Sequence, residues 1–414
     1  MARVIKENEV SSLVSHFSQI PDPRVALRTQ HLLIDILVMT ICAVLCGAKT
    51  CTDFEDYSLG KEKWLRKFLK LPHGIPSHDT FRRVLSIVDS AAMERVFLKW
   101  VEAIIGGRKL KSISLDGKSV AGSPQGGIGG RSALHLVNVY SHEYGLALTQ
   151  VESNGSGGEL TAAIDALDQL NIKDTLVLAD ANFTSSAIAE KIREKRGHYL
   201  LAIKGNRASY HGALINAFEA SSSSKIKTYK KGEYGHGRDE VRRAAVLAAN
   251  PQSLDEIFLS KWPGVKTLIR IERTRTLEDK RPFVQLRDPE TDKIKHVRNP
   301  NQDGKTRISR TSHETAYYVT SKRMTAKEAL REVRKHWGIE NGLHWVLDVA
   351  FAEDDWLARA KRLSRNLSAI RKIGLNLIRS KMLYPKKSIR RHMNMAGWSD
   401  EILEKLVFGR DFDA

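Results

Sequence analysis

The chain has 414 residues, more than one typical domain, so two or three domains with separate cores are expected. Lys and Arg number 67 against 48 Asp and Glu, and the formal net charge of +19 favours an anionic partner, nucleic acid first and an anionic membrane surface second. Three cysteines exclude a disulfide framework, and the first ten residues lack the pattern of a secretory signal, so a reducing cytoplasm is the expected compartment.

Residues 1–108 are predicted to form an N-terminal helical domain. Their longest apolar run, 32–48, is short for a bilayer crossing and contains Asp35, which favours a buried helix over a membrane span. The cysteines on and beside this helix are expected to pack in the core, because a thiol metal site would need a fourth ligand. Arg82 and Arg83, in a later helix, make this domain a candidate reader of a DNA groove.

Residues 109–220 change to the pattern of an α/β fold. The predicted elements are, in order, a strand at 110–117, two strands around a turn in 133–153, a helix at 158–170, a strand at 174–181, a helix at 185–197 and a strand at 198–205. This order predicts a mixed sheet with helical layers.

Residues 221–312 are predicted to be a basic, β-rich insertion in that fold. They begin with a polar hairpin and a further strand and continue as a charged connection punctuated by Pro and Gly. Residues 225–310 contain 21 Lys and Arg against 12 Asp and Glu. The insertion is therefore expected to grip duplex DNA through phosphate contacts.

Residues 313–382 are predicted to complete the α/β core. A strand at 314–321 precedes a long helix, which Thr325 caps together with Glu328 three residues later. We expect this helix to extend into the stretch 335–355, which carries Glu340.

The C-terminal segment is the most skewed in charge. Residues 356–399 hold twelve Lys and Arg and no acidic residue, and part of this stretch has an amphipathic helical pattern. We expect a packed helix with a cationic face that contacts phosphates. Residues 383–414 are predicted to be a basic C-terminal tail.

Two acidic residues end apolar strands, and a third lies on the long helix. Asp116 ends the first core strand and Asp180 ends another, so their carboxylates lie side by side if those strands are neighbours. A helix packed over that edge can bring Glu340 to them. Three converging carboxylates repel one another, and divalent cations relieve the repulsion. Oxygen ligands suit Mg²⁺ or Mn²⁺, and two such ions are the standard device for in-line attack at a phosphodiester.

The helix of Glu340 carries further titratable residues at intervals of four. His336, Glu340 and His344 lack the HExxH spacing of a helical zinc site, so zinc is disfavoured. His336 is either a structural histidine or a residue beside DNA. A group of acids at the end of the helix is predicted to pair with Arg359 or Arg362; its members are Asp348, Glu353, Asp354 and Asp355.

Short stretches spread through most of the chain match one family in order. They are IPDPR, GIPSHDTFRRV, LDGKS, LVLADA, HYLLAIKGN, HGRDEVR and HWGIENGLHWVLDVAFAEDD. On these motifs the chain resembles the H-repeat-associated (ISAs-type) bacterial insertion-sequence transposases of the DDE family. The resemblance implies an RNase H-like mixed-sheet core interrupted by the basic insertion. It also implies metal-dependent cleavage at transposon ends and strand transfer, with Asp116, Asp180 and Glu340 as catalytic residues that ligate two Mg²⁺ or Mn²⁺ ions.

The chain departs from the family pattern in two places. ANFTSS follows Asp180 where the family often has a small residue, Gly and Cys, so the loop over the second acid is expected to differ in shape. Val333, His336 and Leu347 stand where the wider insertion-sequence group has Tyr, Arg and Lys. Phosphate-holding roles are therefore not carried over from that group.

We expect a DNA transposase beside the bacterial nucleoid. Its expected partners are duplex DNA, at the inverted repeats and at the target, and a second copy of the chain, with no membrane partner. A nuclease that cannot join ends and an inactive DNA-binding relic stay open as alternatives. The residues expected to contact DNA are Lys118, Lys204, Asn206, His236, Arg238, His336, His344, Arg359, Lys361, Arg362 and Arg365.

Overall fold

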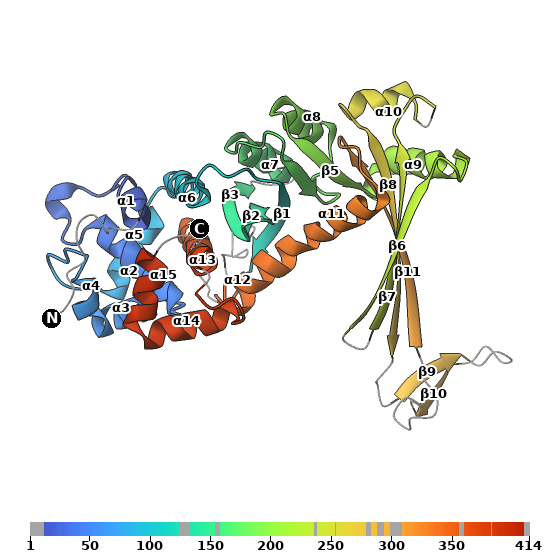
Figure 1. The fold of residues 1–414 in the computed structure, drawn as a ribbon. Helices are drawn as coiled ribbons and strands as arrows, with labels where there is room; N and C mark the ends of the chain where they lie inside the picture. The colour runs from blue at the N-terminus through green and yellow to red at the C-terminus, as the bar shows by residue number, and fades with distance from the viewer. Residues whose placement is uncertain are drawn as a thin grey trace, which may run out of the picture. The chain divides into compact units, whose positions relative to one another are not determined.

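The chain is a mixed α/β protein that divides into two compact units, each described by itself (Figure 1). The first unit comprises Met1–Phe183, Glu194–Gly197 and Lys335–Ala414, and the second comprises Thr184–Arg193 and His198–Arg334. The boundaries expected from the sequence do not separate these units. The computed structural model describes residues 12–121, 123, 133–153, 158–235, 238–252, 254–278, 283–287, 294–298, 309–355, 360–381 and 383–409.

The described residues that precede the first strand are helical, as predicted. The elements are α1 (Ser12–Phe17), the 3₁₀ turn η2 (Ala26–Arg28), α2 (Leu33–Leu45), α3 (Cys51–Gly60), α4 (Glu62–Leu65), α5 (His78–Ile87) and α6 (Ser90–Ile105). The apolar run lies in α2, which is buried along almost its whole length. Its Asp35 carboxylate accepts a hydrogen bond from the backbone N–H of Leu71 at 2.9 Å. The prediction of a core helix is confirmed, and no helix in the described part of the chain is long and apolar enough to cross a membrane.

The sheet of the first unit has the strand order β3-β2-β1-β4. Its strands are β1 (Ser112–Val120), β2 (Leu134–Ser141), β3 (Leu146–Ser153) and β4 (Leu176–Ala179). β1 and β2 pair antiparallel, as do β2 and β3, whereas β1 and β4 pair parallel with Leu115 opposite Ala179. The continuous apolar run of β4 is explained by burial of all four of its residues.

Helices cover both faces of this sheet, because alternate residues of β3 contact different helices. The hydroxyl of Thr149 lies 3.2 Å from the Gln169 side chain, just after α7 (Gly158–Asp168). The side chain of its neighbour Gln150 accepts a hydrogen bond at 2.7 Å from Lys372 in α13 (Lys361–Lys381). The sheet is therefore the middle layer of the first unit.

The C-terminal residues belong to the same unit as the N-terminal helices. α13 packs against α2, α5, α6 and β3. The expected tail instead forms α14 (Ile389–Trp398) and α15 (Asp400–Phe408), which pack against each other and against α2. Buried apolar side chains on both helices, including Met393 and Leu403, explain why this segment is folded despite its charge.

The cations of α13 point into the protein. The Arg365 guanidinium donates to Glu94 at 2.6 and 2.8 Å and to Glu152 at 2.7 Å, and Lys361 pairs with Glu152 at 2.6 Å. Burying a guanidinium is costly unless a carboxylate and hydrogen bonds compensate it. The expected phosphate-binding face of α13 is thus largely engaged within the unit, and Arg362 is the member of the predicted set on this helix that is exposed.

The second unit is built on strands in the order β5-β11-β8-β7-β6. The described pairs in this series are antiparallel. Its elements are α8 (Ser186–Glu194), β5 (His198–Ile203), the 3₁₀ turn η3 (Gly205–Arg207), α9 (Ala208–Ala220), β6 (Lys227–Gly235), β7 (Arg238–Ala248), α10 (Glu256–Lys261), β8 (Thr267–Glu278), the hairpin β9 (Phe283–Arg287) and β10 (Ile294–Arg298), and β11 (Ser309–Thr320). The sequence did not predict α9, α10 or the β9–β10 hairpin.

The Arg365 contacts give a first prediction. Arg365→Ala removes the ion-pair partner of the buried Glu94 and leaves Glu152 with Lys361, so we expect the free energy of unfolding in urea to fall by roughly 3 kcal/mol. Arg362→Ala is the matched control from the exposed side of the same helix, and its effect should stay within about 0.5 kcal/mol. Equal losses in the two variants would contradict this account of α13.

Candidate active site

Asp116 and Asp180 lie on neighbouring strands of the sheet. Contrary to the prediction, Asp116 does not end its strand, because β1 continues through Val120 in register with β2. Asp116 directly follows Leu115 in β1, and Asp180 directly follows Ala179 at the end of β4, and those two preceding residues are paired in the parallel register. The backbone N–H of Gly117 donates to Asp116 Oδ1 at 2.9 Å. The side chain of Asp180 is oriented by backbone N–H groups of the following turn, one of them at 3.0 Å. The parallel pairing therefore brings the two acids together.

Glu340 lies where a helix changes its winding. α11 (Ala326–Ile339) begins with the predicted capping box, since Glu328 accepts from the N–H and hydroxyl of Thr325, both at 2.9 Å. Glu340 then starts a π-helical turn, η5 (Glu340–His344), which continues into α12 (Trp345–Val349). Such single turns are frequent at functional sites. The Glu340 side chain is exposed.

Two glycines let this helix approach the sheet closely. A Cβ atom added to Gly342 would lie 2.7 Å from the Tyr140 hydroxyl, and one added to Gly338 would lie 3.1 Å from His142 Nδ1. The Arg379 guanidinium of α13 donates to the Gly342 carbonyl within the π turn and at 3.2 Å to Tyr140. The helix is therefore seated on β2 on both sides of Glu340.

The three acids interact electrostatically. Burial raises the pKa of Asp116 to about 7, and the negative charges of Asp180, Glu340 and Glu159 add to the shift, while the hydrogen bond from Gly117 opposes it. The structure thus brings the predicted carboxylates within electrostatic reach of one another. It does not gather them into ligand geometry: in the described part of the chain no three His, Cys, Asp or Glu side chains are close enough to hold one metal ion.

The surroundings of Asp116 nevertheless suit a divalent cation. Besides burial, three further carboxylates raise the pKa of Asp116, and this repulsion is what a bound cation relieves. Beside the backbone N–H of Gly117, the imidazole of His344 faces Asp116, with Nδ1 3.5 Å from Asp116 Oδ2. Burial lowers the pKa of His344 to about 3, with help from Lys372 and Lys118, so the imidazole is neutral and adds no competing charge. A hard, oxygen-preferring ion fits this set better than zinc.

The other helix histidine faces the sheet. His336 Nδ1 lies 3.4 Å from the hydroxyl of Ser114 on β1, and His142 Nε2 lies 2.7 Å from the same hydroxyl. This is the position expected of a structural histidine that orients the helix. His336 and His344 contact different β1 residues, two positions apart, in agreement with the argument against a shared zinc ion.

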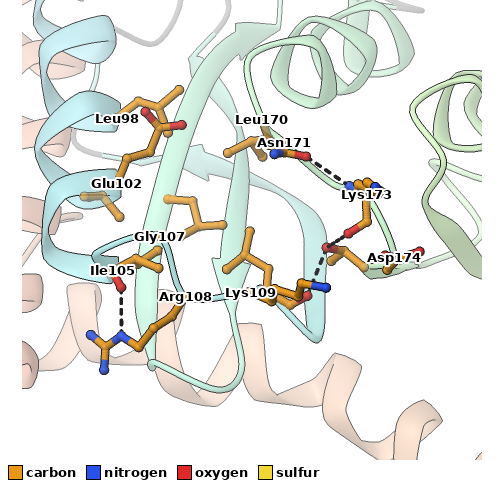
Figure 2. A pocket seen from close by; sticks show the side chains of 14 residues that line it. Leu98, Glu102, Ile105, Gly107, Arg108, Lys109, Leu170, Asn171, Lys173 and Asp174 are labelled. Carbon is orange, nitrogen blue, oxygen red and sulfur yellow. Dashed lines mark hydrogen bonds between the residues drawn. The ribbon is translucent and has the colours of Figure 1, made fainter. Parts of the chain in front are cut away.

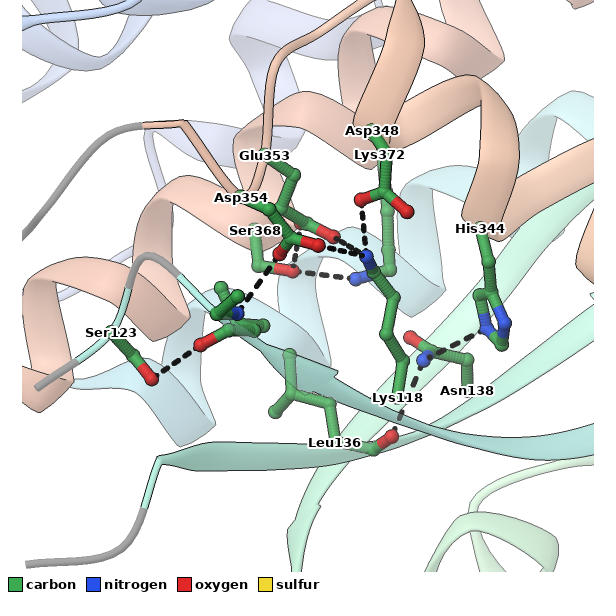
Figure 3. Close-up of polar contacts among 12 residues, drawn as sticks. Lys118, Ser123, Leu136, Asn138, His344, Asp348, Glu353, Asp354, Ser368 and Lys372 are labelled. Carbon is green, nitrogen blue, oxygen red and sulfur yellow. Dashed lines mark hydrogen bonds and ion pairs between the residues drawn. The ribbon is translucent and has the colours of Figure 1, made fainter. Parts of the chain in front are cut away.

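Lys118 is buried in a cluster of carboxylates (Figure 3). Its side chain is 9% exposed, and its ammonium contacts Asp348 and lies 3.4 Å from Asp354 and 3.6 Å from Glu353. Although burial opposes its charge, these carboxylates raise the pKa of Lys118. An exposed phosphate contact at this lysine does not agree with these interactions. The predicted acidic cluster exists, but Lys118 rather than Arg362 is the partner observed for three of its acids, while Asp355 lies 3.9 Å from Lys49.

The remaining residues expected to contact DNA are distributed over both units. Lys204 and Asn206 are exposed around η3, and Arg238 is half-buried at the start of β7. His236 and Arg359 lie outside the described residues. The carboxylate site lies entirely within the first unit.

Sequence reasoning missed several residues around the carboxylates. Glu159 at the start of α7 contacts His135 Nε2 at 2.5 Å and adds negative charge near Asp116. A Cβ added at Gly117, the residue after Asp116, would lie 2.6 Å from the His135 ring, so this close approach needs a glycine. No pattern in the sequence points to Glu159. Trp337 and Trp345, on either side of Glu340, are 51% and 60% exposed, which is unusual for tryptophan outside a binding surface.

A separate cavity of about 380 Å³ lies at the opposite end of β1 (Figure 2). Leu98, Ile105 and Leu170 line it together with Lys109, and the Arg108 guanidinium beside it donates to the Ile105 carbonyl at 2.7 Å. These residues come from the end of α6 and the turns that precede β1 and β4. The cavity is therefore not part of the carboxylate site.

Comparisons with known proteins show the family of the chain. Residues 107–377 match the family model described as the transposase DDE domain, and residues 14–101 match the model described as DDE_Tnp_1-associated. The chain is 34% identical over 373 residues to "Putative transposase YncI" of Escherichia coli O157:H7, covering 89% of this chain and 88% of that protein. It is 30% identical over 403 residues to "H repeat-associated putative transposase YhhI" of Escherichia coli K12, covering 97% and 99%.

One shorter relative is named as inactive. "Inactive transposase YbfQ" of Escherichia coli K12 is 42% identical over 78 residues, which cover 19% of this chain and 93% of that protein. The longer matches include both the helical N-terminal part and the whole region from β1 to α13. By the extent of these matches, the chain belongs to the DDE transposase family and is a DNA transposase similar to the H-repeat-associated members.

Proposed function

We propose that this transposase cleaves DNA at the ends of its element and joins the freed 3′ hydroxyls to target DNA, with Asp116, Asp180 and Glu340 as the catalytic carboxylates. The observation that carries the proposal is the parallel pairing of β1 and β4, which brings Asp180 to Asp116. Glu340 lies close enough that its charge and that of Asp180 both raise the pKa of Asp116. Acids that repel one another at a strand edge cost stability, so a functional reason for keeping them is favoured. The order β3-β2-β1-β4 supports the RNase H-like core that the sequence predicts.

The same three side chains would hold Mg²⁺ or Mn²⁺, two ions in the full site. When bound, the ions supply the charge that in-line attack at a phosphodiester needs. The protein holds Asp180 with backbone N–H groups, keeps His344 neutral beside Asp116, and fixes the turn of Glu340 with Arg379. The proposed ligands are thus oriented by groups that are already in place.

Duplex DNA and a second copy of the chain are the proposed partners. The net charge of +19 supports binding to a polyanion. The exposed Trp337 and Trp345 offer flat apolar surfaces beside Glu340 on which bases can stack. In the second unit, the exposed Lys204 and the basic strands β6–β8 support phosphate contacts. Because two transposon ends must be joined in one reaction, we propose that two chains act together.

A paired-end assay separates the proposed reaction from its alternatives. The protein is incubated with Mg²⁺ and duplexes that carry the inverted repeats flanking the coding region, together with a target plasmid. Transposition predicts both cleaved ends and joined products. Cleaved ends without any joined product would indicate a nuclease, and binding without cleavage would indicate a relic.

The carboxylate assignment predicts a sharp loss of activity. Asp116→Asn, Asp180→Asn and Glu340→Gln should each reduce cleavage at least about a thousandfold, the scale expected when an essential group of a catalytic unit is removed. The affinity for the same duplex, measured by fluorescence anisotropy, should change by no more than about twofold. These residues are negatively charged, so they do not attract the phosphates of the DNA. Asp355→Asn is the matched control, because this exposed acid pairs only distantly with Lys49. Cleavage that survives the three substitutions defeats the assignment.

The raised pKa of Asp116 predicts an effect on stability. The charged form is disfavoured in the folded protein, so its cost is present above about pH 7 and disappears as the pH falls towards the ordinary value of 3.8. Without divalent ions, Asp116→Asn should therefore raise the melting temperature by roughly 2 °C or more above pH 7, and the gain should shrink below it. Added Mg²⁺ should stabilise the original protein more than the variant.

Calorimetry or dye-based thermal unfolding measures this difference, with Asp355→Asn again as control. A variant that melts at or below the temperature of the original protein above pH 7 would contradict the proposed repulsion. An equal Mg²⁺ effect on both would contradict the proposed ligand.

A further inference from the structure

The positive charge of residues 356–399 is divided between two helices with different surroundings. On α13 the cations Arg365, Lys372 and Arg379 are directed into the protein and hydrogen-bonded there. On α14 and the turn before it, Lys386, Arg390 and Arg391 are exposed. Among the described residues no carboxylate pairs with any of these last three. Apart from Arg362 at the start of α13, the exposed cations in the described part of this segment therefore lie on α14 and in the turn before it.

α14 is firmly seated by its other face. His392, Met393 and Ala396 are buried, and Gly397 approaches α2 closely enough that an added Cβ would lie 3.6 Å from the Cys46 carbonyl oxygen. Ser388 caps the first turn by accepting from the backbone N–H of Arg391 at 3.3 Å. The exposed face is thus presented on a rigid helix of ten residues rather than on a loose tail.

The exposed face combines three kinds of side chain. Lys386, Arg390 and Arg391 supply charge near the N-terminal end, Asn394 is exposed one turn further on, and Trp398 is 80% exposed at the C-terminal end. Lysine and arginine bind phosphates, and arginine and asparagine side chains can also hydrogen-bond base edges in a groove. The composition is that of a helix that lies along a polyanion.

Acids near the end of α14 do not neutralise this face. Asp400 pairs with Lys61 at 2.6 Å, and Glu401 pairs with Lys405 at 2.7 Å. Lys387, the other cation in the turn before α14, has its ammonium 4.4 Å from the centre of the Tyr384 ring and is held there by the protein. The three exposed cations therefore keep their charge available to a partner.

We propose that the exposed face of α14, formed by Lys386, Arg390, Arg391, Asn394 and Trp398, is a contact surface for duplex DNA. This inference rests on the proposed binding of DNA by the transposase and moves the C-terminal contact from α13 to α14. A membrane surface is disfavoured, because an interfacial helix needs a broad apolar face towards the lipid and the apolar face of α14 is buried in the protein.

The test compares two triple variants of the full chain. Lys386→Ala/Arg390→Ala/Arg391→Ala removes the proposed contacts, and Lys63→Ala/Lys67→Ala/Lys99→Ala removes the same charge from exposed positions on or near α4 and on α6. Affinity for a fluorescein-labelled duplex is measured by anisotropy between about 50 and 200 mM salt, where phosphate contacts dominate. Circular dichroism checks that both variants are folded.

The expected result is a loss of affinity of about tenfold or more at the lower salt, together with a smaller salt dependence. Each lost phosphate contact should reduce the slope of log K against log salt by about 0.9. Unchanged affinity and slope in the α14 variant would overturn the proposal, as would an equal loss in the control variant. Tighter binding to phosphatidylserine vesicles than to the duplex, lost in the α14 variant, would also overturn it in favour of a membrane surface.

Failure of this proposal can be told apart from failure of the proposed reaction. Asp116→Asn should bind the duplex with the salt slope of the original protein. If the original protein binds DNA without cutting it and the α14 variant still loses binding, the surface stands and the reaction does not. Asn394→Ala adds a specific readout: it should narrow the difference in affinity between the inverted-repeat duplex and a scrambled duplex while leaving the salt slope unchanged.

Discussion

The first unit depends on the pairing of the cations that α13 carries into its interior. A buried guanidinium or ammonium needs a carboxylate or several carbonyl groups around it, and its own segment of sequence contains no acid. The partners therefore come from distant elements: Glu94 from α6, Glu152 from β3 and Glu353 from the stretch after α12. This requirement joins the N-terminal helices, the sheet and the helix of Glu340 into one body.

The same kind of pairing holds the carboxylates of the candidate site near one another. Lys118 follows Asp116 by two residues on β1 and contacts Asp348, which follows Glu340 on the next helical segment. The attraction between this strand and this helix opposes the repulsion among the acids beside it. On β1, Asp116 is repelled by the neighbouring carboxylates, whereas Lys118, two residues later, is attracted to Asp348. This attraction allows the region to carry excess negative charge and remain folded.

The sequence predicted features whose signal is local. Apolar runs predicted β1 and β4, and the acids after those runs predicted the two strand carboxylates, although β1 continues past Asp116 to Val120. Thr325 with Glu328 predicted the start of α11. It could not predict the direction of the α13 cations, because their partners lie more than two hundred residues away in the chain for Glu94 and Glu152. It also did not predict α9, whose weakly amphipathic sequence gives no clear period, or the helices of the expected tail, where charge masked the buried positions.

The π turn at Glu340 has a consequence for how this region can change in evolution. The turn lets two separate contacts form along the helix. Gly338 and Gly342 pack closely against the sheet, and Asp348 pairs with Lys118. Loss of one residue inside the π turn can be absorbed by a return to α-helical winding, but loss of one residue of α12 between 345 and 347 would rotate everything downstream by about 100°. Asp348 would then leave Lys118, so homologues that gain or lose a residue here should also differ at the lysine.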